Sequence, residues 1–176
     1  MRLLLHSCCA SCSTSVIEQL KDEFDITVIY YNPNIEPIEE YEKRKETQIN
    51  FLKQIKIDYV NIDYLNGEFK ERIKGDENEP ENGQRCSKCY ELRLEKTAVI
   101  ALENDFNYFC TTLSVSPHKN TKLINEIGLD LEKKYKVKYL QSDFKKNDGY
   151  QRSINLAKEY NLYRQKYCGC LYSKGE

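Results

Sequence analysis

The sequence predicts an α/β fold, an open and mainly parallel five-stranded sheet in the order 3-2-1-4-5 with helices on both faces. Strand-like and helix-like segments alternate along the whole chain, which is typical of parallel βαβ units. The most unusual residues follow the first and fourth expected strands, which flank the point where the strand order reverses and where such sheets bind ligands. The length of 176 residues suits a single domain over residues 1–176.

The first half of the predicted sheet comes from three segments. Residues 2–6 are mostly leucine and are expected to form a short buried strand, and apolar residues at helical spacing predict a helix over residues 13–24. Residues 26–31 are β-branched and aromatic, which indicates a second strand. A loop over residues 32–37 ends this strand. Pro37 then suits the first turn of a helix that runs to about residue 55.

The middle of the chain carries an acidic loop between regular elements. Residues 59–64 are expected to form the third strand, and residues 69–73 a short helical turn. Residues 75–84 are acidic and rich in Gly, Pro and Asn, which indicates a surface loop. A helix over residues 86–103 and a fourth strand over residues 108–112 follow.

The last segments complete the alternation. Residues 120–135 and 149–160 are expected to be helices, with a fifth strand over residues 137–140 between them. The loop over residues 112–120 would then leave the carboxyl end of the fourth strand. It would share an edge of the sheet with the residues that follow the first strand.

Seven of the eight cysteines fall into three tight groups. The groups are Cys8, Cys9 and Cys12; Cys86 and Cys89; and Cys168 and Cys170. Cysteines that serve packing would be scattered singly, as Cys110 is, so the groups indicate a metal site or redox chemistry. A chain of this length needs no disulfide staples. We expect no leader, and no apolar run approaches the ~20 residues of a membrane span, so the expected compartment is the cytoplasm, where thiols stay reduced.

Four cysteines are candidates to share one metal centre. Cys86 and Cys89 lie three residues apart at a predicted helix start, so both sulfurs share a face, and the helix N-terminus favours their thiolates. Cys8 and Cys9 end the first strand. Four thiolates suit tetrahedral zinc or an iron–sulfur cluster equally well. The irregular spacing and the position at a sheet edge favour the iron–sulfur cluster.

The remaining grouped cysteines allow more than one role. Cys12 is either a ligand of a second metal, an alternative ligand, or a small core residue. A bridge between Cys168 and Cys170 would close a very small, strained ring that is easily reduced, which suits an electron relay. The alternative is a tail of metal ligands.

Several polar residues are candidates for substrate contacts. His118 lies in the loop after the fourth strand and is a candidate proton donor, as are Asp143 and Tyr163, whereas His6 either finishes its strand or takes part in catalysis. Residues 117–176 carry 13 Lys and Arg against 7 Asp and Glu, which is compatible with a polyanionic partner such as RNA. The candidate phosphate contacts are Lys119, Lys145, Lys146 and Arg164. Ordinary solvated helix faces would account for the same charges.

Six motifs in order resemble one family, the epoxyqueuosine reductases of the QueH type. They are LLHSCCASCS (4–13), YYNPNIEPIEEYEKR (30–44), RCSKCYELRLEKTA (85–98), TTLSVSPHKN (111–120), DFKKNDGYQRS (143–153) and YRQKYCGC (163–170). One departure is Ser11, which stands where the family motif carries Pro.

The resemblance implies both an activity and a site. The activity is the two-electron reduction of the epoxide of epoxyqueuosine at the tRNA wobble position to give queuosine, with electrons from a donor that the sequence does not reveal. The implied [4Fe-4S] ligands are Cys8, Cys9, Cys86 and Cys89. The implied redox-active, disulfide-forming pair is Cys168 and Cys170, and a further iron is implied near Cys12.

The implied sheet is Rossmann-like and HUP-like. It resembles that of the PP-loop nucleotide hydrolases, but the Ser-Gly-Gly phosphate loop is missing, so ATP chemistry is not implied. Two other functions compete with the reductase: a zinc-stabilised nucleic-acid-binding module, and a thiol–disulfide oxidoreductase that works without metal. Iron and sulfide in an anaerobic preparation distinguish the reductase from both.

Overall fold

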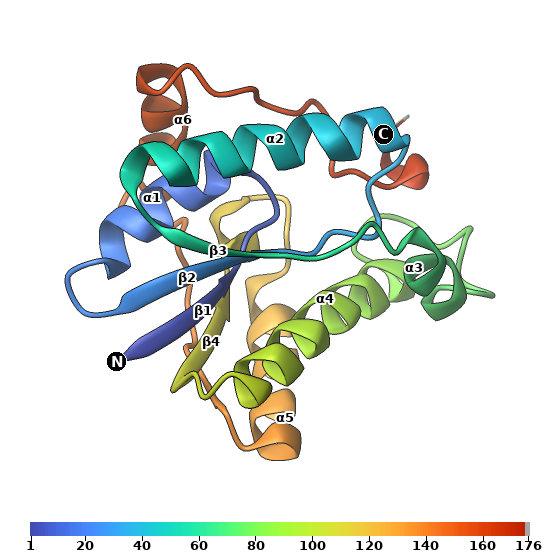
Figure 1. Cartoon of the computed structure of the whole chain (residues 1–176). Coiled ribbons are helices and arrows are strands. Elements are labelled where there is room, and N and C mark those ends of the chain that lie inside the picture. Colours follow the sequence, from blue (N-terminus) through green and yellow to red (C-terminus); the bar gives the residue numbers. More distant parts are fainter. Residues whose placement is uncertain (175–176) are drawn as a thin grey trace.

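The structure, a computed structural model that describes residues 1–174, contains a five-stranded parallel sheet (Figure 1). The strands are β1 (Arg2–His6), β2 (Asp25–Tyr30), β3 (Asp58–Asn61), β4 (Tyr108–Thr111) and β5 (Lys138–Tyr139). Their order is β3-β2-β1-β4-β5, and every neighbouring pair is parallel. The predicted fold class and strand order are therefore confirmed.

Helices cover both faces of this sheet (Figure 1). They are α1 (Ala10–Leu20), α2 (Ile38–Ile55), α3 (Asn66–Arg72), α4 (Gln84–Glu103), α5 (Thr121–Tyr135) and α6 (Gly149–Glu159), with short 3₁₀ helices η1 (Thr112–Val115) and η2 (Leu171–Ser173). Figure 1 shows α1, α2 and α6 on one face and α4 and α5 on the other, with α3 beside α4. Within residues 1–174, no helix is both long and apolar enough to cross a membrane.

The alternation of side chains along β1 builds a separate core on each face. Leu3 and Leu5 pack with α1 and α2, whereas Leu4 packs with α4 and α5. All three leucines are fully buried, as expected of a central parallel strand covered on both faces. Cys110 is buried in the first of these cores, as the sequence predicts.

Helix α1 begins three residues earlier than the sequence predicts. Cys9 is its N-cap, and the Cys9 sulfur accepts a hydrogen bond from the backbone N–H of Cys12 at 3.4 Å. Cysteine is not among the usual N-cap residues, which are Ser, Thr, Asp and Asn, so the sequence pattern predicts a start of α1 that is too late. As a result Cys12 lies in the first turn of α1, directly beside the other two cysteines.

His6 connects the carboxyl ends of the central strands. Its Nδ1 is 2.9 Å from the Thr111 hydroxyl on β4, and its Nε2 is 3.0 Å from the carbonyl oxygen of Tyr31, which follows β2. Burial lowers the pKa of His6 to about 4, so the ring is neutral at pH 7. Both ring nitrogens have partners, so His6 serves as a structural link at the end of its strand.

Candidate functional site

Three cysteine sulfurs meet where β1 turns into α1. The sulfurs of Cys8, Cys9 and Cys12 all lie within 4.8 Å of one another. Cys8 is also tied to the end of β4, because its backbone N–H donates to the Thr112 hydroxyl at 3.1 Å and this hydroxyl donates to the Cys8 sulfur at 3.4 Å. The two central strands together therefore position the group.

Hydrogen bonds within this group favour one thiolate. The pKa of Cys8 is well below its usual value because of side-chain hydrogen bonds with Cys12 and Cys9. The pKa of Cys12 is correspondingly raised, because its thiol donates to Cys8. The group thus stabilises a negative charge on sulfur, the form that binds metals.

Cys86 and Cys89 lie at the start of α4 and border the same core as Cys8. Cys89 is buried in that core, and Cys8 and Cys86 pack against it. The backbone N–H of Asn82 donates to the Cys86 sulfur at 3.3 Å. Burial raises the pKa of both thiols, that of Cys89 to about 11. Neither belongs to the tight group of three sulfurs, so their assignment as ligands stays a prediction.

The third pair of cysteines approaches from the C-terminal segment. The Cys168 sulfur accepts a hydrogen bond from Lys119 Nζ at 3.1 Å, whereas the Cys170 thiol donates to the Ser173 hydroxyl at 3.5 Å. All eight cysteines lie within the described residues and all are free. The predicted disulfide bond between Cys168 and Cys170 is therefore not present in this structure, since each thiol has a different partner.

A buried arginine holds the loop that carries this pair. Arg44 on α2 donates to the carbonyl oxygens of Cys168 at 3.0 Å and Tyr167 at 3.1 Å, and its Nε donates to Glu40 at 2.7 Å. Its side chain is 1% exposed. The sequence interpretation missed this role, because the arginine and the loop lie 124 residues apart in sequence.

A cavity of about 510 Å³ is lined by residues from the turn after β1, from α4, from the loop after β4 and from the C-terminal segment. Cys8, Cys12 and Cys168 line it together with the cations Arg93 and Lys119. Positive side chains in a hollow that also exposes thiols favour an anionic group there. Cys168 and the first cysteine group therefore border one cavity, an arrangement that the strand order alone does not predict.

The candidate polar residues divide into two sets. His118 and Arg164 line the cavity, and both are exposed. Lys119 also lines it, but its ammonium is bound to Cys168 rather than free for a phosphate.

The other candidates have partners outside the set of residues that line the cavity. Asp143 pairs with Lys145 at 3.5 Å and with Lys146 at 3.6 Å, and the Tyr163 hydroxyl donates to Glu40 at 3.0 Å. Neither Asp143 nor Tyr163 is placed by the structure to reach a substrate in the cavity.

Arg93 is a second residue that the sequence interpretation missed. It lines the cavity from α4, is 2% exposed, and has one guanidinium nitrogen, Nη2, without a hydrogen-bond partner. A signal was available, because Cys86, Cys89 and Arg93 share a helical face at spacings of three and four residues.

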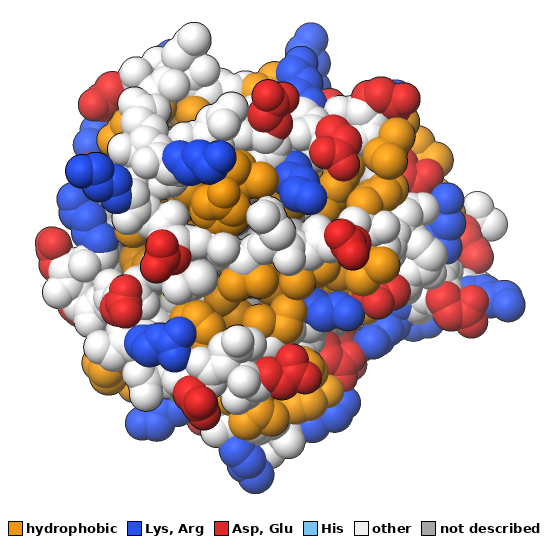
Figure 2. Space-filling model, viewed as in Figure 1, with side chains coloured by type: hydrophobic (Ala, Val, Ile, Leu, Met, Phe, Trp, Pro, Cys, Tyr) orange, Lys and Arg blue, Asp and Glu red, His pale blue; other side chains and the backbone are white. Residues whose placement is uncertain are grey.

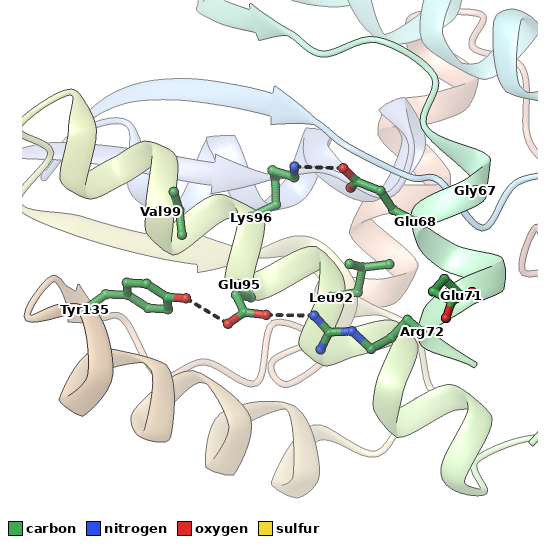
Figure 3. Close-up of a pocket in the computed structure, with 9 residues that line it drawn as sticks. All are labelled: Gly67, Glu68, Glu71, Arg72, Leu92, Glu95, Lys96, Val99 and Tyr135. Carbon is green, nitrogen blue, oxygen red and sulfur yellow. Dashed lines mark hydrogen bonds and ion pairs between the residues drawn. The ribbon is translucent and has the colours of Figure 1, made fainter. Parts of the chain in front are cut away.

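A larger hollow of about 800 Å³ lies between α3, α4 and α5 (Figure 3). Its polar groups satisfy one another: Glu95 accepts hydrogen bonds from Arg72, Lys134 and Tyr135, and Lys96 pairs with Glu68. No cysteine is among the described residues that line it. It is therefore a weaker candidate for redox chemistry than the smaller cavity.

The molecular surface does not single out a basic face in the view of Figure 2. Positive and negative side chains are interspersed there, with apolar side chains between them. This face therefore offers no continuous positive surface for a polyanion.

The donor set fits an iron–sulfur centre. Three sulfurs lie close together, two more cysteines border the same core, and the unpartnered Arg93 nitrogen and the Lys119 ammonium supply positive charge. Thiolate ligands and hydrogen-bond donors near sulfur are what such clusters require.

Two solved structures share the fold. The U34-tRNA thiolase NcsA from Methanococcus maripaludis, solved with its [4Fe-4S] cluster, aligns with a TM-score of 0.60 at 17% identity over 98% of this chain, which spans 61% of the thiolase chain. A predicted subunit of tRNA methyltransferase from Methanocaldococcus jannaschii aligns with a TM-score of 0.53 at 16% identity, over 90% of this chain and 74% of that chain. At these identities the likeness establishes the fold alone.

Sequence relatives are much closer. Epoxyqueuosine reductase QueH from Streptococcus pyogenes is 45% identical over 97% of this chain and 69% of its own length, and that from Staphylococcus epidermidis is 44% identical over 98% of this chain and 76% of its own length. The family model for epoxyqueuosine reductase QueH matches residues 3–176. With the cysteine-lined cavity, these matches establish that the chain belongs to the QueH family of epoxyqueuosine reductases.

Proposed function

We propose that this chain reduces the epoxide of epoxyqueuosine at the tRNA wobble position and gives queuosine in tRNA. The observation that carries the proposal is the group of Cys8, Cys9 and Cys12, whose sulfurs lie within 4.8 Å beside a cavity that Cys168 also lines. Membership of the QueH family supports the choice of substrate.

The proposed cofactor is a [4Fe-4S] cluster. We assign its ligands to Cys8, Cys9, Cys86 and Cys89, and we assign Cys12 to a further iron beside it. The bound cluster would supply electrons one at a time. Cys8, Cys12 and Arg93 line the same cavity, which supports a position for the cluster beside it.

The reaction requires two electrons and two protons, and the epoxide oxygen leaves as water. Oxidation of the Cys168 thiolate and the Cys170 thiol to a disulfide releases two electrons and one proton, and the proposed donor His118 supplies the second proton, so one turnover balances. An external donor must then reduce the disulfide. The cavity-facing position of Cys168 supports its role as the member of the pair nearer to the substrate.

Polar residues at the cavity are proposed to bind the nucleotide. His118 is the proposed proton donor to the epoxide oxygen, since it lines the cavity and is exposed. Arg164 is proposed to contact a phosphate there, and Lys145 and Lys146 are proposed to contact phosphates farther along the tRNA. Binding through phosphates would weaken steeply as salt rises.

The decisive experiment is anaerobic reconstitution with iron and sulfide, followed by incubation with tRNA that carries epoxyqueuosine. Nucleoside analysis by mass should detect queuosine with the unmodified chain. Cys86→Ala should lose both the cluster and the activity, whereas the matched control Cys110→Ala, in the core, should keep both. A colourless protein with a single bound zinc and no queuosine would refute the proposal.

A further inference from the structure

Arg93 is a buried cation without a carboxylate partner. Its side chain donates from Nε to the Cys89 carbonyl oxygen at 3.4 Å and from Nη1 to Asn32 Oδ1 at 3.3 Å, and Nη2 has no partner. Arginine is almost never fully buried unless it is paired. Among residues 1–174, no ion pair includes Arg93.

The cavity that Arg93 lines is also lined by three thiols, those of Cys8, Cys12 and Cys168. A thiolate among them would attract the buried guanidinium, which has no carboxylate partner to satisfy it.

Two hydrogen bonds, one to a side chain and one to the backbone, hold the guanidinium between the cysteine groups. Asn32, which accepts from Arg93, donates through its own Nδ2 to the carbonyl oxygen of Ser7 at 2.9 Å, one residue before Cys8. The Cys89 carbonyl oxygen holds the other side. The side chain thus connects α4 to the loop after β2, and through Asn32 to the loop after β1, and it forms part of the cavity wall.

We infer that Arg93 donates the free Nη2 hydrogen bond to a sulfur of the iron–sulfur centre and stabilises its reduced state. The inference rests on the proposed function, because it requires a cluster among these cysteines. Each added electron makes the centre more negative. A fixed cation and a hydrogen bond to sulfur stabilise that charge, and hydrogen bonds to the sulfurs are an established control of cluster potential.

The test is the midpoint potential of the reconstituted, full-length protein, measured by spectroscopically monitored redox titration. Arg93→Met should lower the potential. A tenfold weaker preference for the reduced state corresponds to about 59 mV for a one-electron couple. Arg93→Lys keeps the charge without the planar fork, so its potential should fall between the two. Arg72→Met, which removes a cation paired with Glu95 outside the cavity, should leave the potential unchanged.

Two further measurements keep the inference falsifiable. The cluster-free Arg93→Met protein should melt no lower than the unmodified chain, because a buried charge without a carboxylate partner has been removed. If Arg93→Met fails to fold, the shift expected for Arg93→Lys decides the question. An unchanged potential with a raised KM for tRNA would overturn the inference and assign Nη2 to the substrate.

Failure of the proposed function has a different signature. In that case the unmodified chain itself would bind no iron and sulfide, or would leave epoxyqueuosine unreduced while carrying a cluster. A cluster that forms and turns over normally, with equal potentials in the unmodified and Arg93→Met proteins, refutes only the role of Arg93.

Discussion

Lys119 donates a hydrogen bond from Nζ to the sulfur of Cys168 over 3.1 Å. Burial opposes ionisation of Cys168, but the charges of Lys119 and Arg93 outweigh burial and lower its pKa. Cys170 has no cation as a hydrogen-bond partner; its thiol is 7% exposed and donates to Ser173. The two thiols of the pair are therefore not equivalent, and Cys168 is the one stabilised as a thiolate.

Replacing Lys119 should slow the chemistry of Cys168. In Lys119→Met the pKa of Cys168 should rise, because the hydrogen bond and the positive charge are lost. Each unit of that rise reduces the thiolate about tenfold at a pH below the pKa. The rate of iodoacetamide alkylation at Cys168, followed by mass spectrometry on cluster-free protein from pH 6 to 9, measures the change.

Lys122→Met is the matched control for this experiment, since the side chain of Lys122 is 88% exposed on α5 and its ion pair within residues 1–174 is with Glu126. It should leave the alkylation profile unchanged. Equal profiles for Lys119→Met and the unmodified chain would show that the hydrogen bond does not activate Cys168.

Gly169 is required between the two cysteines. Its φ is +140°, and a Cβ there would lie 2.9 Å from Ile35 Cγ1 and 3.4 Å from Arg44 Nη1. We expect Gly169→Ala to lower the free energy of unfolding by about 1–3 kcal/mol, which urea denaturation measures. Gly67→Ala, in α3 with nothing within 4 Å of the new Cβ, should be neutral or stabilising. Equal stability of the two variants would contradict this account of the loop.

The sheet was predictable because its signals are local. β1 is a run of leucines, and its alternation between two cores follows from the period of a strand. The shortest strand, β5, is predicted over residues 137–140. It is shorter in the structure, because only Lys138 and Tyr139 pair with β4. The N-cap at Cys9 was missed because sulfur is not a usual cap.

The cysteines of the site were predictable, and the arginines around them were not. Groups of cysteines at short spacing are visible in sequence, and the strand order brings Cys8 and Cys9 to the same edge as the loop after β4. Arg44 lies on a helix whose other residues are largely polar, where an arginine ordinarily faces solvent. Arg93 shares a helical face with Cys86 and Cys89, which indicates its side of α4 but not its burial. Their burial depends on the loops that fold over them, which no local pattern encodes.

Removing Arg44 should destabilise the chain. Arg44→Met would leave the carboxylate of Glu40 with only the Tyr163 hydroxyl as a partner, and two carbonyl oxygens of the C-terminal loop without donors. We expect a loss of about 3 kcal/mol in the free energy of unfolding, measured by urea denaturation at pH 7. Lys53→Met, on the exposed face of the same helix, should change it by less than about 0.5 kcal/mol. A similar small change for both variants would show that Arg44 does not hold the loop.

Glu95 should make stability depend on acid pH. Burial opposes its ionisation, but hydrogen bonds from Lys134, Arg72 and Tyr135 outweigh burial and lower its pKa to about 2 from an ordinary 4.5 (Figure 3). A carboxyl group with a lowered pKa in the folded state stabilises the fold above pH 4.5. That contribution is lost as the pH falls toward 2, because the unfolded chain takes up the proton first.

The expected size of this effect is modest because solvent screens the group. The full shift corresponds to about 3 kcal/mol, and partial exposure reduces it to about 1 kcal/mol. Urea denaturation at pH 7 and pH 3 should therefore show a loss of stability about 1 kcal/mol larger in the unmodified chain than in Glu95→Gln. Glu126→Gln, which removes an exposed carboxylate 3.9 Å from Lys122, should behave like the unmodified chain. If Glu95→Gln loses as much stability at pH 3 as the unmodified chain, the ion-pair network in this hollow does not stabilise the fold.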